Sequence, residues 1–344
     1  MLRNTCYNMG MNEPKIELLT PQKYISEAIE LLAKAERRVF LIGLLMYRDN
    51  VTTDFVDALL ATAKRGVDVH IAADFATFSF GLNKNELVKS GVRVIRDSSK
   101  LSREFRQSGA KFRWLGRNYG TLFASRTHSK WLVVDDTVFA FGGVNTDDEA
   151  IVMNNDYMFR VDDATLADTI EKEHREIERA DRTKRLTRNH REKSSIGTVL
   201  FDDGHPGRSI IYNTAADLAK EADSLTLVSQ YQPTGRLAGI IRRKEDAADL
   251  YFNPLSNAEN ASNKFMLLLG KNDLRKKNLY KSSQYLHAKF IIFNMEDGRK
   301  IALTGSHNFV AAGSRIGTRE VALLTENKRV IAELEKFFAE KVLK

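Results

Sequence analysis

The segment from His128 to Asn145 groups three side chains that can act on a phosphate. His128 and Lys130 stand two positions apart at the start of an apolar run, and Asn145 follows the pair Gly142–Gly143. Apolar residues on both sides of Asp135–Asp136 predict a hairpin of two buried strands. Alternate residues of a strand point the same way, so His128 and Lys130 share a face. An imidazole, an ammonium and an amide then meet where the glycines let the backbone approach, which predicts a phosphate site with a nucleophile.

The second half of the chain repeats this arrangement. His287 and Lys289 precede a further apolar run, and Ser306 and Asn308 stand where the glycine pair and the asparagine stand in the first half. The second hairpin is longer and contains Asp297–Gly298, a strong turn signal. Two such hairpins at corresponding places indicate an internal duplication with a shared chemical role.

These residues suit the cleavage of a phosphodiester without a metal ion. A neutral histidine can attack phosphorus and become a phosphohistidine, while a protonated one gives its proton to the leaving alcohol and later activates the acceptor. An unperturbed pKa of about 6.5 makes both forms accessible near neutral pH. We expect His128 to be the nucleophile and His287 the acid and base, or the reverse. Phosphate oxygens would be met by Lys130, Lys289, Asn145, Asn308, Ser306 and the Gly143 backbone.

Each histidine also needs an acceptor on its other ring nitrogen, and two acids are placed to provide one. Asp156 follows Asn145 by eleven residues and Glu320 follows Asn308 by twelve, each at the head of an apolar strand. We expect Asp156 to orient His128 and Glu320 to orient His287.

The remaining histidines give no indication of a metal site. His307 adjoins Asn308 and is interpreted as a residue at the edge of the site, not as a catalyst. No metal ion or other cofactor is expected, because the other four are not grouped at metal-ligand spacing: His70, His174, His190 and His205.

The composition restricts the classes of protein to which this chain can belong. The chain has 344 residues, of which 43% are hydrophobic and 28% charged, which suits two packed globular domains. Its longest apolar run, 39–46, is too short to cross a bilayer, and its first residues lack the hydrophobic region of a signal peptide. Cys6 is the single cysteine, so the chain forms no internal disulfide. We therefore expect a cytoplasmic protein, and the net charge of +8 favours a polyanionic partner, either nucleic acid or an anionic membrane surface.

Apolar periodicity predicts an α/β fold, because strands alternate with helices in each half. We expect a loose tail over 1–15, a first domain over 16–195 and a second over 196–344. A basic run at 174–193 is interpreted as a solvated helix face and linker, or as an arm that contacts phosphate or lipid. The expected helices are 21–38, 53–66, 85–90, 210–222 and 237–243, and the expected strands outside the hairpins are 39–45, 67–73, 92–95, 225–229 and 248–252.

The paired motifs, His-x-Lys followed by Asn, resemble those of the phospholipase D superfamily. The resemblance covers about residues 20–340. It implies two α/β/α sandwich domains related by a pseudo-twofold axis, one active site at their interface, and phosphohistidine catalysis. Both motifs lie in one chain, so no oligomer is required for the site. The segment from Gly142 to Asn145, followed by 147–149, further resembles the bacterial cardiolipin synthase and phosphatidyltransferase branch.

One position departs from the family pattern. The family has an aspartate five residues after the motif lysine, as Asp135 here, but the second motif has Asn294. If this acid stabilises the hairpin turn, the Asp297–Gly298 turn can replace it. If the acid instead tunes the charge of the site, the second half is weakened. We favour the first interpretation.

Two aromatic segments bear on the substrate. Residues 75–82 follow a predicted strand, and 112–119, with Trp114 and Tyr119, precede the first motif. They could hold acyl chains at a membrane, stack bases of single-stranded nucleic acid, or pack over the core.

The branch resemblance favours lipid among these substrates. We expect phosphatidyl transfer or hydrolysis on an anionic phospholipid at a peripheral membrane surface, with an alcohol or water as acceptor. A nuclease or other phosphodiesterase, and a non-catalytic binder of anionic lipid or nucleic acid, are the alternatives.

Overall fold

The computed structural model describes residues 14–44, 46–75, 77, 91–116, 126–185, 187–258, 261–271, 278–311 and 317–344. Most of the predicted tail, the predicted helix at 85–90 and Tyr119 lie outside these residues.

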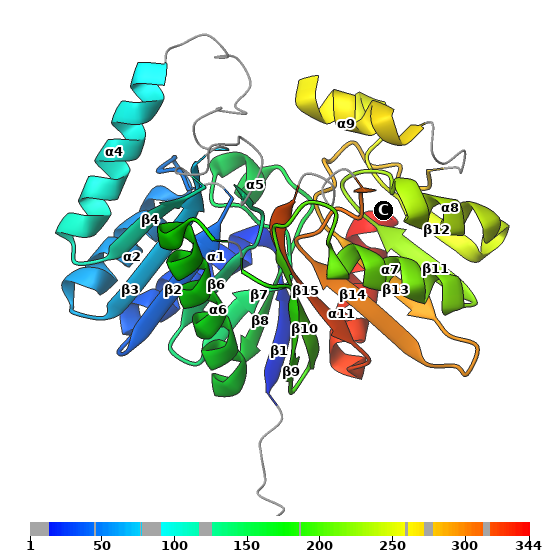
Figure 1. Ribbon diagram of the computed structural model, residues 1–344, viewed down its shortest axis with the longest axis horizontal. Coiled ribbons are helices and arrows are strands. Elements are labelled where there is room, and N and C mark those ends of the chain that lie inside the picture. The colour runs from blue at the N-terminus through cyan, green and yellow to red at the C-terminus, as the bar shows by residue number, and fades with distance from the viewer. Residues whose placement is uncertain are drawn as a thin grey trace, which may run out of the picture.

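Seven strands form the first sheet, in the order β1-β8-β7-β6-β2-β3-β4 (Figure 1). The neighbours β2, β3 and β4 run parallel, and the other neighbours in the sheet run antiparallel. The strands are β1 (Lys15–Leu19), β2 (Arg38–Gly43), β3 (Asp68–Asp74), β4 (Lys111–Leu115), β6 (Trp131–Val134), β7 (Thr137–Ala140) and β8 (Met158–Asp162). The helices of this half are α1 (Pro21–Lys34), α2 (Thr53–Lys64), α4 (Gly91–Gln107), α5 (Asp148–Val152) and α6 (Ala164–Thr183).

The second sheet has the order β12-β11-β13-β14-β15-β10-β9, and the short strand β5 (Arg126–Thr127) joins it at β15. Its strands are β9 (His190–Ser194), β10 (Gly197–Asp203), β11 (Ser224–Val228), β12 (Ala248–Tyr251), β13 (Phe290–Asn294), β14 (Lys300–Gly305) and β15 (Thr318–Thr325). The helical segments are α7 (Ile210–Glu221), α8 (Gly235–Arg243), η1 (Glu245–Ala247), η2 (Leu255–Asn257), α9 (Ala261–Lys271), α11 (Lys328–Phe337) and the π-helical η3 (Phe338–Val342).

The element order confirms the duplication. In each sheet the two strands of the motif hairpin lie side by side between two other strands. Strands β6 and β7 lie between β2 and β8, and strands β13 and β14 lie between β11 and β15. Thus β2 corresponds to β11, β3 to β12, and β8 to β15, although β12 is an edge strand and β3 has β4 as a further neighbour. The predicted α/β architecture with two related halves is correct.

Apolar side chains build three main layers of core. One lies between the first sheet and α1, α2 and α4, and another lies between the second sheet and α7 and α8. The third is shared, because α6, α11 and the inner faces of both sheets contribute to one continuous cluster. The two halves therefore pack as one body around a common core, which fixes the two motif hairpins relative to each other.

The sequence prediction was wrong at two places in the first half. Residues 92–95 were expected to form a strand but belong to α4, and the parallel strand that follows is β4. A short apolar run does not distinguish a strand from a helix, and 91–107 contains no proline or internal glycine that would end a helix. In addition, β9 and β10 form a hairpin of the second sheet, so the predicted boundary at residue 195 divides this hairpin.

Asp135 lies away from the motif side chains, at the far end of its strand. Its carboxylate accepts hydrogen bonds from the backbone N–H groups of Glu36, Arg37 and Arg38 at 2.9 to 3.0 Å, so it holds the loop before β2. Asn294 occupies the corresponding place and donates to Ser224 Oγ at 2.9 Å, at the start of β11. The aspartate-to-asparagine departure therefore changes a structural contact and leaves the charge of the site unaltered.

Among the helices that the structure describes, none combines the length and the apolar character that crossing a bilayer requires.

Candidate active site

The two His-x-Lys pairs stand immediately before β6 and β13, and their lysines are buried. Lys130 and Lys289 are 1% and 0% exposed. Lys130 Nζ donates to the carbonyl of His128 at 3.0 Å, and Lys289 Nζ donates to the carbonyl of His287. Each ammonium is thus folded back beside its own histidine, which places one positive charge next to each imidazole.

Each motif is held against the other half of the chain by the same backbone contact. The N–H of His128 donates to the carbonyl of Arg319 at 2.8 Å, because β5 pairs in parallel with the start of β15. The N–H of His287 donates to the carbonyl of Asn155 at 3.0 Å, next to the parallel bridge between Asn155 and Leu286. In both cases the residue after the acceptor carries an acid. The acid of each half is therefore brought to the histidine of the other.

The acid pairing expected from the sequence is wrong, and the observed pairing is crossed. His128 Nδ1 lies 2.9 and 3.0 Å from the two carboxylate oxygens of Glu320, and His287 Nδ1 lies 2.6 Å from Asp156 Oδ2. The physical reason is that the acids begin strands which meet the opposite motif through the interface contacts above. Since both rings use Nδ1 for the acid, Nε2 is the nitrogen left for a substrate.

The glycine corners are needed because the backbones approach closely. A Cβ at Gly142 would lie 1.8 Å from the carbonyl oxygen of Tyr157, and one at Gly305 would lie 2.2 Å from that of Val321. A side chain at Gly143 would meet the carboxylate of Asp156 at 2.6 Å. These positions therefore admit only hydrogen as a side chain.

Gly143 and Ser306 contact the two acids. The N–H of Gly143 donates to Asp156 Oδ1 at 3.3 Å, and Ser306 Oγ donates to Glu320 Oε2. We predicted both residues as phosphate contacts, and the structure gives each a role in positioning an acid.

Asn145 and Asn308 hold corresponding positions after the two corners. The side-chain oxygen Oδ1 of each is buried and has no hydrogen-bond partner within the described part of the chain. Buried polar groups are nearly always paired, so an amide left open in each half is a polar group available to a ligand.

Burial and the neighbouring cations make both histidines weakly basic. Burial lowers the pKa of His128 to about 4, against the opposing effect of Glu320. Burial likewise lowers the pKa of His287 to about 4, and Lys289 adds to this effect. Both imidazoles are therefore neutral at pH 7 in the unliganded protein, which is the protonation state of a nucleophile.

The lysines and the acids are shifted in opposite senses. Burial lowers the pKa of Lys130 to about 8 and that of Lys289 to about 7. Burial alone would raise the pKa of Asp156, but His287 and Lys289 hold it below its usual value. In the same way His128 and other neighbours lower the pKa of Glu320 to about 2 despite burial. Cations held in a dry site with depressed pKa values are stabilised by an incoming anion.

Three residues at the interface between the two halves were not predicted as site residues from the sequence. Asp74 Oδ2, at the end of β3, accepts from the N–H of Thr127 at 3.0 Å, and Asn253 Oδ1, after β12, accepts from the N–H of Leu286 at 2.8 Å. They fix the residue before each motif histidine. The hydroxyl of Tyr157 lies 2.5 Å from Thr304 Oγ1, across the two halves. The available signal for the first two was their place at the carboxyl ends of corresponding parallel strands.

Of the other predicted residues, Trp114 lies in β4 and is buried against Phe112 and Phe75, with ring centroids 4.9 and 6.1 Å apart. Core packing is thus the interpretation that its position supports. His307 Nδ1 accepts from the N–H of Phe309 at 2.8 Å, so it stabilises the loop beside Asn308.

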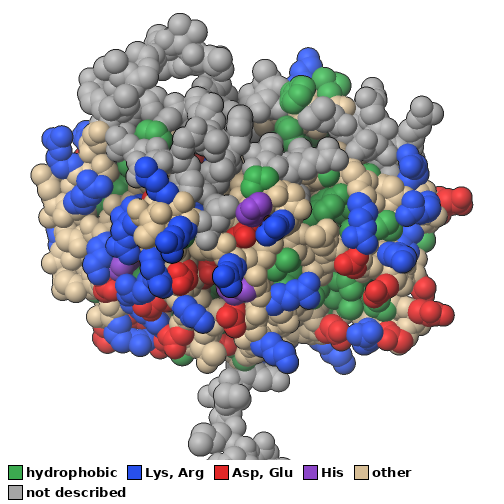
Figure 2. Space-filling model, viewed as in Figure 1, with side chains coloured by type: hydrophobic (Ala, Val, Ile, Leu, Met, Phe, Trp, Pro, Cys, Tyr) green, Lys and Arg blue, Asp and Glu red, His purple; other side chains and the backbone are tan. Residues whose placement is uncertain are grey.

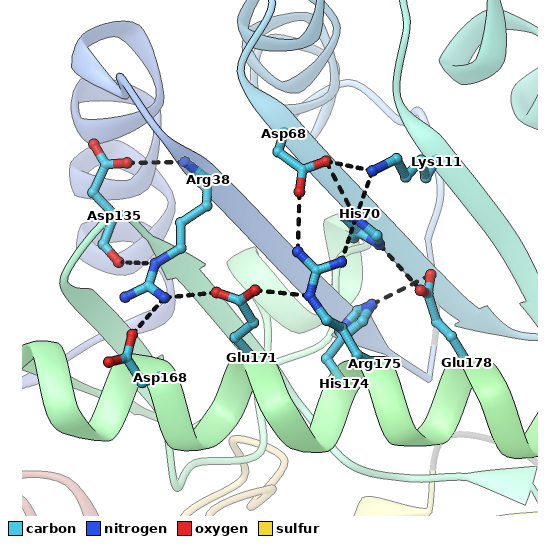
Figure 3. Close-up of polar contacts among 10 residues, drawn as sticks. All are labelled: Arg38, Asp68, His70, Lys111, Asp135, Asp168, Glu171, His174, Arg175 and Glu178. Atoms are coloured by element: carbon cyan, nitrogen blue, oxygen red, sulfur yellow. Dashed lines mark hydrogen bonds and ion pairs between the residues drawn. The ribbon is translucent and has the colours of Figure 1, made fainter.

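The fold brings together two histidines and a glutamate that the sequence did not group. His70, His174 and Glu178 are buried with their ligand atoms within 4.8 Å of one another (Figure 3). His70 Nε2 lies 3.2 Å from the ammonium of Lys111 and 3.3 Å from Asp68 Oδ1, and its Nδ1 lies 3.1 Å from Glu178. His174 Nδ1 accepts from Trp131 Nε1, which leaves its hydrogen on Nε2. Lys111 and Trp131 already contact the ring nitrogens that do not face Glu178, so the trio is a buried polar cluster in which only His70 is hydrogen-bonded to Glu178.

Comparisons with known proteins agree with this geometry. Residues 28–177 match the family described as cardiolipin synthase, PLD-like domain. Cardiolipin synthase B of Salmonella typhimurium is 24% identical over 201 residues, which are 57% of this chain and 44% of that protein. The chain thus spans less than half the length of this curated relative.

Two solved structures share the fold over nearly the whole chain. Phosphatidylserine synthase of Haemophilus influenzae aligns with a TM-score of 0.73 at 15% identity, over 96% of this chain and 88% of its own. Polyphosphate kinase of Porphyromonas gingivalis aligns with a TM-score of 0.61 at 11% identity, over 94% of this chain and 49% of its own. Residues 28–177 thus carry a PLD-like domain of the cardiolipin synthase type, and the second half of the chain repeats its His-x-Lys arrangement.

Proposed function

We propose that this chain is a phosphodiester-transferring enzyme that moves phosphatidyl groups to an alcohol or to water through a phosphohistidine. The observation that carries the proposal is the crossed pairing of His128 with Glu320 and of His287 with Asp156 beside two buried lysines. Two imidazoles with fixed orientation and two cations are the groups that metal-free phosphoryl chemistry requires.

In the first step, Nε2 of His128 attacks phosphorus and a P–N bond forms while the P–O bond to the leaving alcohol breaks. His287 gives a proton to the departing oxygen. In the second step, His287 takes a proton from the acceptor alcohol or water, whose oxygen attacks phosphorus as the P–N bond breaks. The donor ester and the acceptor are thus exchanged, and both histidines return to their starting states. The symmetry of the site permits the two histidines to exchange these roles.

The lowered pKa values of both histidines provide a neutral nucleophile before the substrate binds, and substrate binding then favours the protonated acid. A neutral histidine attacks without prior deprotonation. A bound phosphodiester brings a negative charge close to both imidazoles, and an opposite charge raises the pKa of the nearby histidine that must donate a proton. Lys130 and Lys289 would neutralise the charge that develops on the phosphate oxygens.

Exposed apolar side chains support lipid as the substrate. Among the described residues, six of the seven exposed large hydrophobic side chains lie in segments that follow β2, β7 and β12, at the edge of the sheets that carries the site, and are 38% to 60% exposed. Figure 1 places α5 and α9, which carry or adjoin most of them, along this edge. They are Val51, Val152, Met153, Leu255, Phe265 and Leu268. Such a rim suits contact with the surface of a membrane that holds the substrate.

Purified protein incubated with phosphatidylglycerol vesicles and a chelator, followed by mass spectrometry of the lipids, tests the proposal. Cardiolipin with free glycerol is the expected product, and phosphatidic acid would show that water is the acceptor. Cleavage of single-stranded DNA without lipid turnover would move the substrate to nucleic acid. Absence of turnover with both phosphatidylglycerol and single-stranded DNA would contradict the proposed enzymatic activity.

His128→Ala and His287→Ala should abolish turnover. His205→Ala is the matched control, because among the described residues the ring of this histidine bonds only to Pro206 of its own loop, and it lies outside the motifs. Loss of activity in the control alone would contradict the proposed site.

A further inference from the structure

A second charged site lies between α4, β4 and α6. A hollow of about 650 Å³ is lined by six basic side chains from these three elements, together with His70 and Glu178. The six are Arg106, Lys111, Arg113, Arg175, Arg179 and Arg182. Figure 2 shows basic side chains gathered over this part of the surface, around α6. The hollow includes part of the basic run at 174–193 that the sequence left open to two interpretations.

The spacing of these residues directs them to one place. Arg175, Arg179 and Arg182 are four and three residues apart on α6, so they share one face of the helix. Lys111 and Arg113 are alternate residues of β4 and share one face of the sheet. Like charges in such arrangements repel each other, and an anion in the hollow would relieve this repulsion.

Part of the basic set is held in place by acids behind the hollow. Arg175 contacts Asp68 at 3.0 Å and Glu171 at 2.7 Å, and Lys111 contacts Asp68 at 2.7 Å (Figure 3). Arg113 contacts Asp181 at 3.3 Å.

Two arginines at the mouth of the hollow are not paired in this way. Arg106 and Arg182 are exposed and make no ion pair with a described residue. Their exposed guanidinium groups can therefore reach a ligand in the hollow.

The one carboxylate in the lining is already engaged. Glu178 accepts from His70 Nδ1 at 3.1 Å and lies 3.7 Å from His174 Nε2, and its side chain is only 9% exposed. Its hydrogen bond to His70 and its burial hold it in the wall, so it offers little repulsion to an anion. The lining thus presents six cations and one occupied acid, and four of the cations are also paired with acids outside the lining, among them Arg179 with Glu176 at 2.6 Å.

The hollow is separate from the active site. Strand β3 begins beside the hollow, at Asp68 and His70, and ends at Asp74, which contacts Thr127 next to the first motif histidine. From His70, which lines the hollow, to Asp74 the strand spans about 13 Å. The hollow therefore lies toward the end of this strand opposite to the apolar rim, which favours a soluble ligand.

We infer that this hollow binds a soluble phosphate-bearing anion. Guanidinium groups bind phosphate oxygens in pairs, and the hollow is large enough for a small phosphorylated molecule. This inference is independent of the reaction proposed above, because it uses none of the motif residues.

Calorimetric titration with pyrophosphate tests the inference with Arg106→Ser/Arg182→Ser. The change should weaken binding by roughly tenfold or more, since two charge-assisted contacts are lost. Arg242→Ser/Arg243→Ser is the matched control, because it removes two exposed arginines of α8 and should leave the affinity unchanged. Circular dichroism checks that each variant is folded.

Three results would overturn the inference. The first is wild-type protein that binds no pyrophosphate. The second is an Arg106→Ser/Arg182→Ser variant that binds pyrophosphate with the affinity of wild type, which would place the ligand elsewhere. The third is a loss of pyrophosphate affinity in the Arg242→Ser/Arg243→Ser control equal to that in the Arg106→Ser/Arg182→Ser variant. A parallel titration with vesicles of phosphatidic acid or phosphatidylcholine separates the sources: binding to the acidic vesicles alone, lost in the Arg106→Ser/Arg182→Ser variant, would assign the hollow to a lipid head group instead.

Discussion

The crossed contact between His128 and Glu320 predicts an energetic coupling between residues 192 positions apart in sequence. Glu320→Gln keeps the size of the side chain and removes its charge, and His128→Ala removes the ring. If the two side chains interact directly, the double variant loses less stability than the sum of the single variants, because the shared contact is lost only once.

The structure sets the size of this coupling. His128 Nδ1 lies 2.9 and 3.0 Å from the two oxygens of a buried carboxylate. A hydrogen bond to a charged group contributes about 1.5 to 3 kcal/mol, and we expect a coupling in this range. The lowered pKa of Glu320, about 2, agrees in direction, since His128 is the largest influence that opposes burial there.

Urea unfolding of wild type, the two single variants and the double variant at neutral pH measures the coupling without reference to activity. The same design with Asp156→Asn and His287→Ala should give a coupling of similar size. The mismatched cycle of Asp156→Asn with His128→Ala should give less than about 0.5 kcal/mol. A large coupling in the mismatched cycle, with a negligible one for Glu320 and His128, would refute the crossed pairing.

Three further predictions concern stability and metal dependence. The free energy of unfolding should fall by about 2 kcal/mol for each of His128 and His287 when the pH is lowered from 7 to 5. The reason is that the imidazoles of the unfolded chain bind protons below about pH 6.5, whereas the folded ones, with a pKa of about 4, do not. Urea unfolding measures this change, and equal stability at the two pH values would contradict it. Gly142→Ala should cost more than about 3 kcal/mol, because its Cβ would lie 1.8 Å from a backbone oxygen, whereas Gly298→Ala, in a turn with φ of 81° and open space around it, should cost about 1 to 2 kcal/mol by the same thermal or urea assay. Turnover should be unchanged after dialysis against a chelator, since Lys130 and Lys289 are placed to supply the positive charge; activity restored only by an added divalent ion would show that the lysines are insufficient.

Local pattern was enough to predict the elements that carry the chemistry. Four apolar residues after Lys130 and after Lys289, with turn residues beyond them, specify hairpins that need no distant partner to be recognised. The repeat of the His-x-Lys and Asn set predicted the duplication for the same reason. Where local pattern was ambiguous the prediction was wrong, as at 92–95, where an apolar run too short to show its period lies in α4.

The sequence by itself predicted the two His-x-Lys pairs, the two asparagines and the two acids, and only the tertiary structure decided how the histidines and acids pair. Equal spacing in the two halves suggested that each acid serves the histidine of its own half. The backbone pairing of β5 with β15, and of Asn155 with Leu286, instead brings each acid to the opposite motif. The burial of Trp114 and the meeting of six basic residues beside α6 were decided in the same way. Periodicity describes which face of an element is buried, but the partner on that face is set by contacts between segments far apart in the chain, and these form only when the two halves pack around their common core.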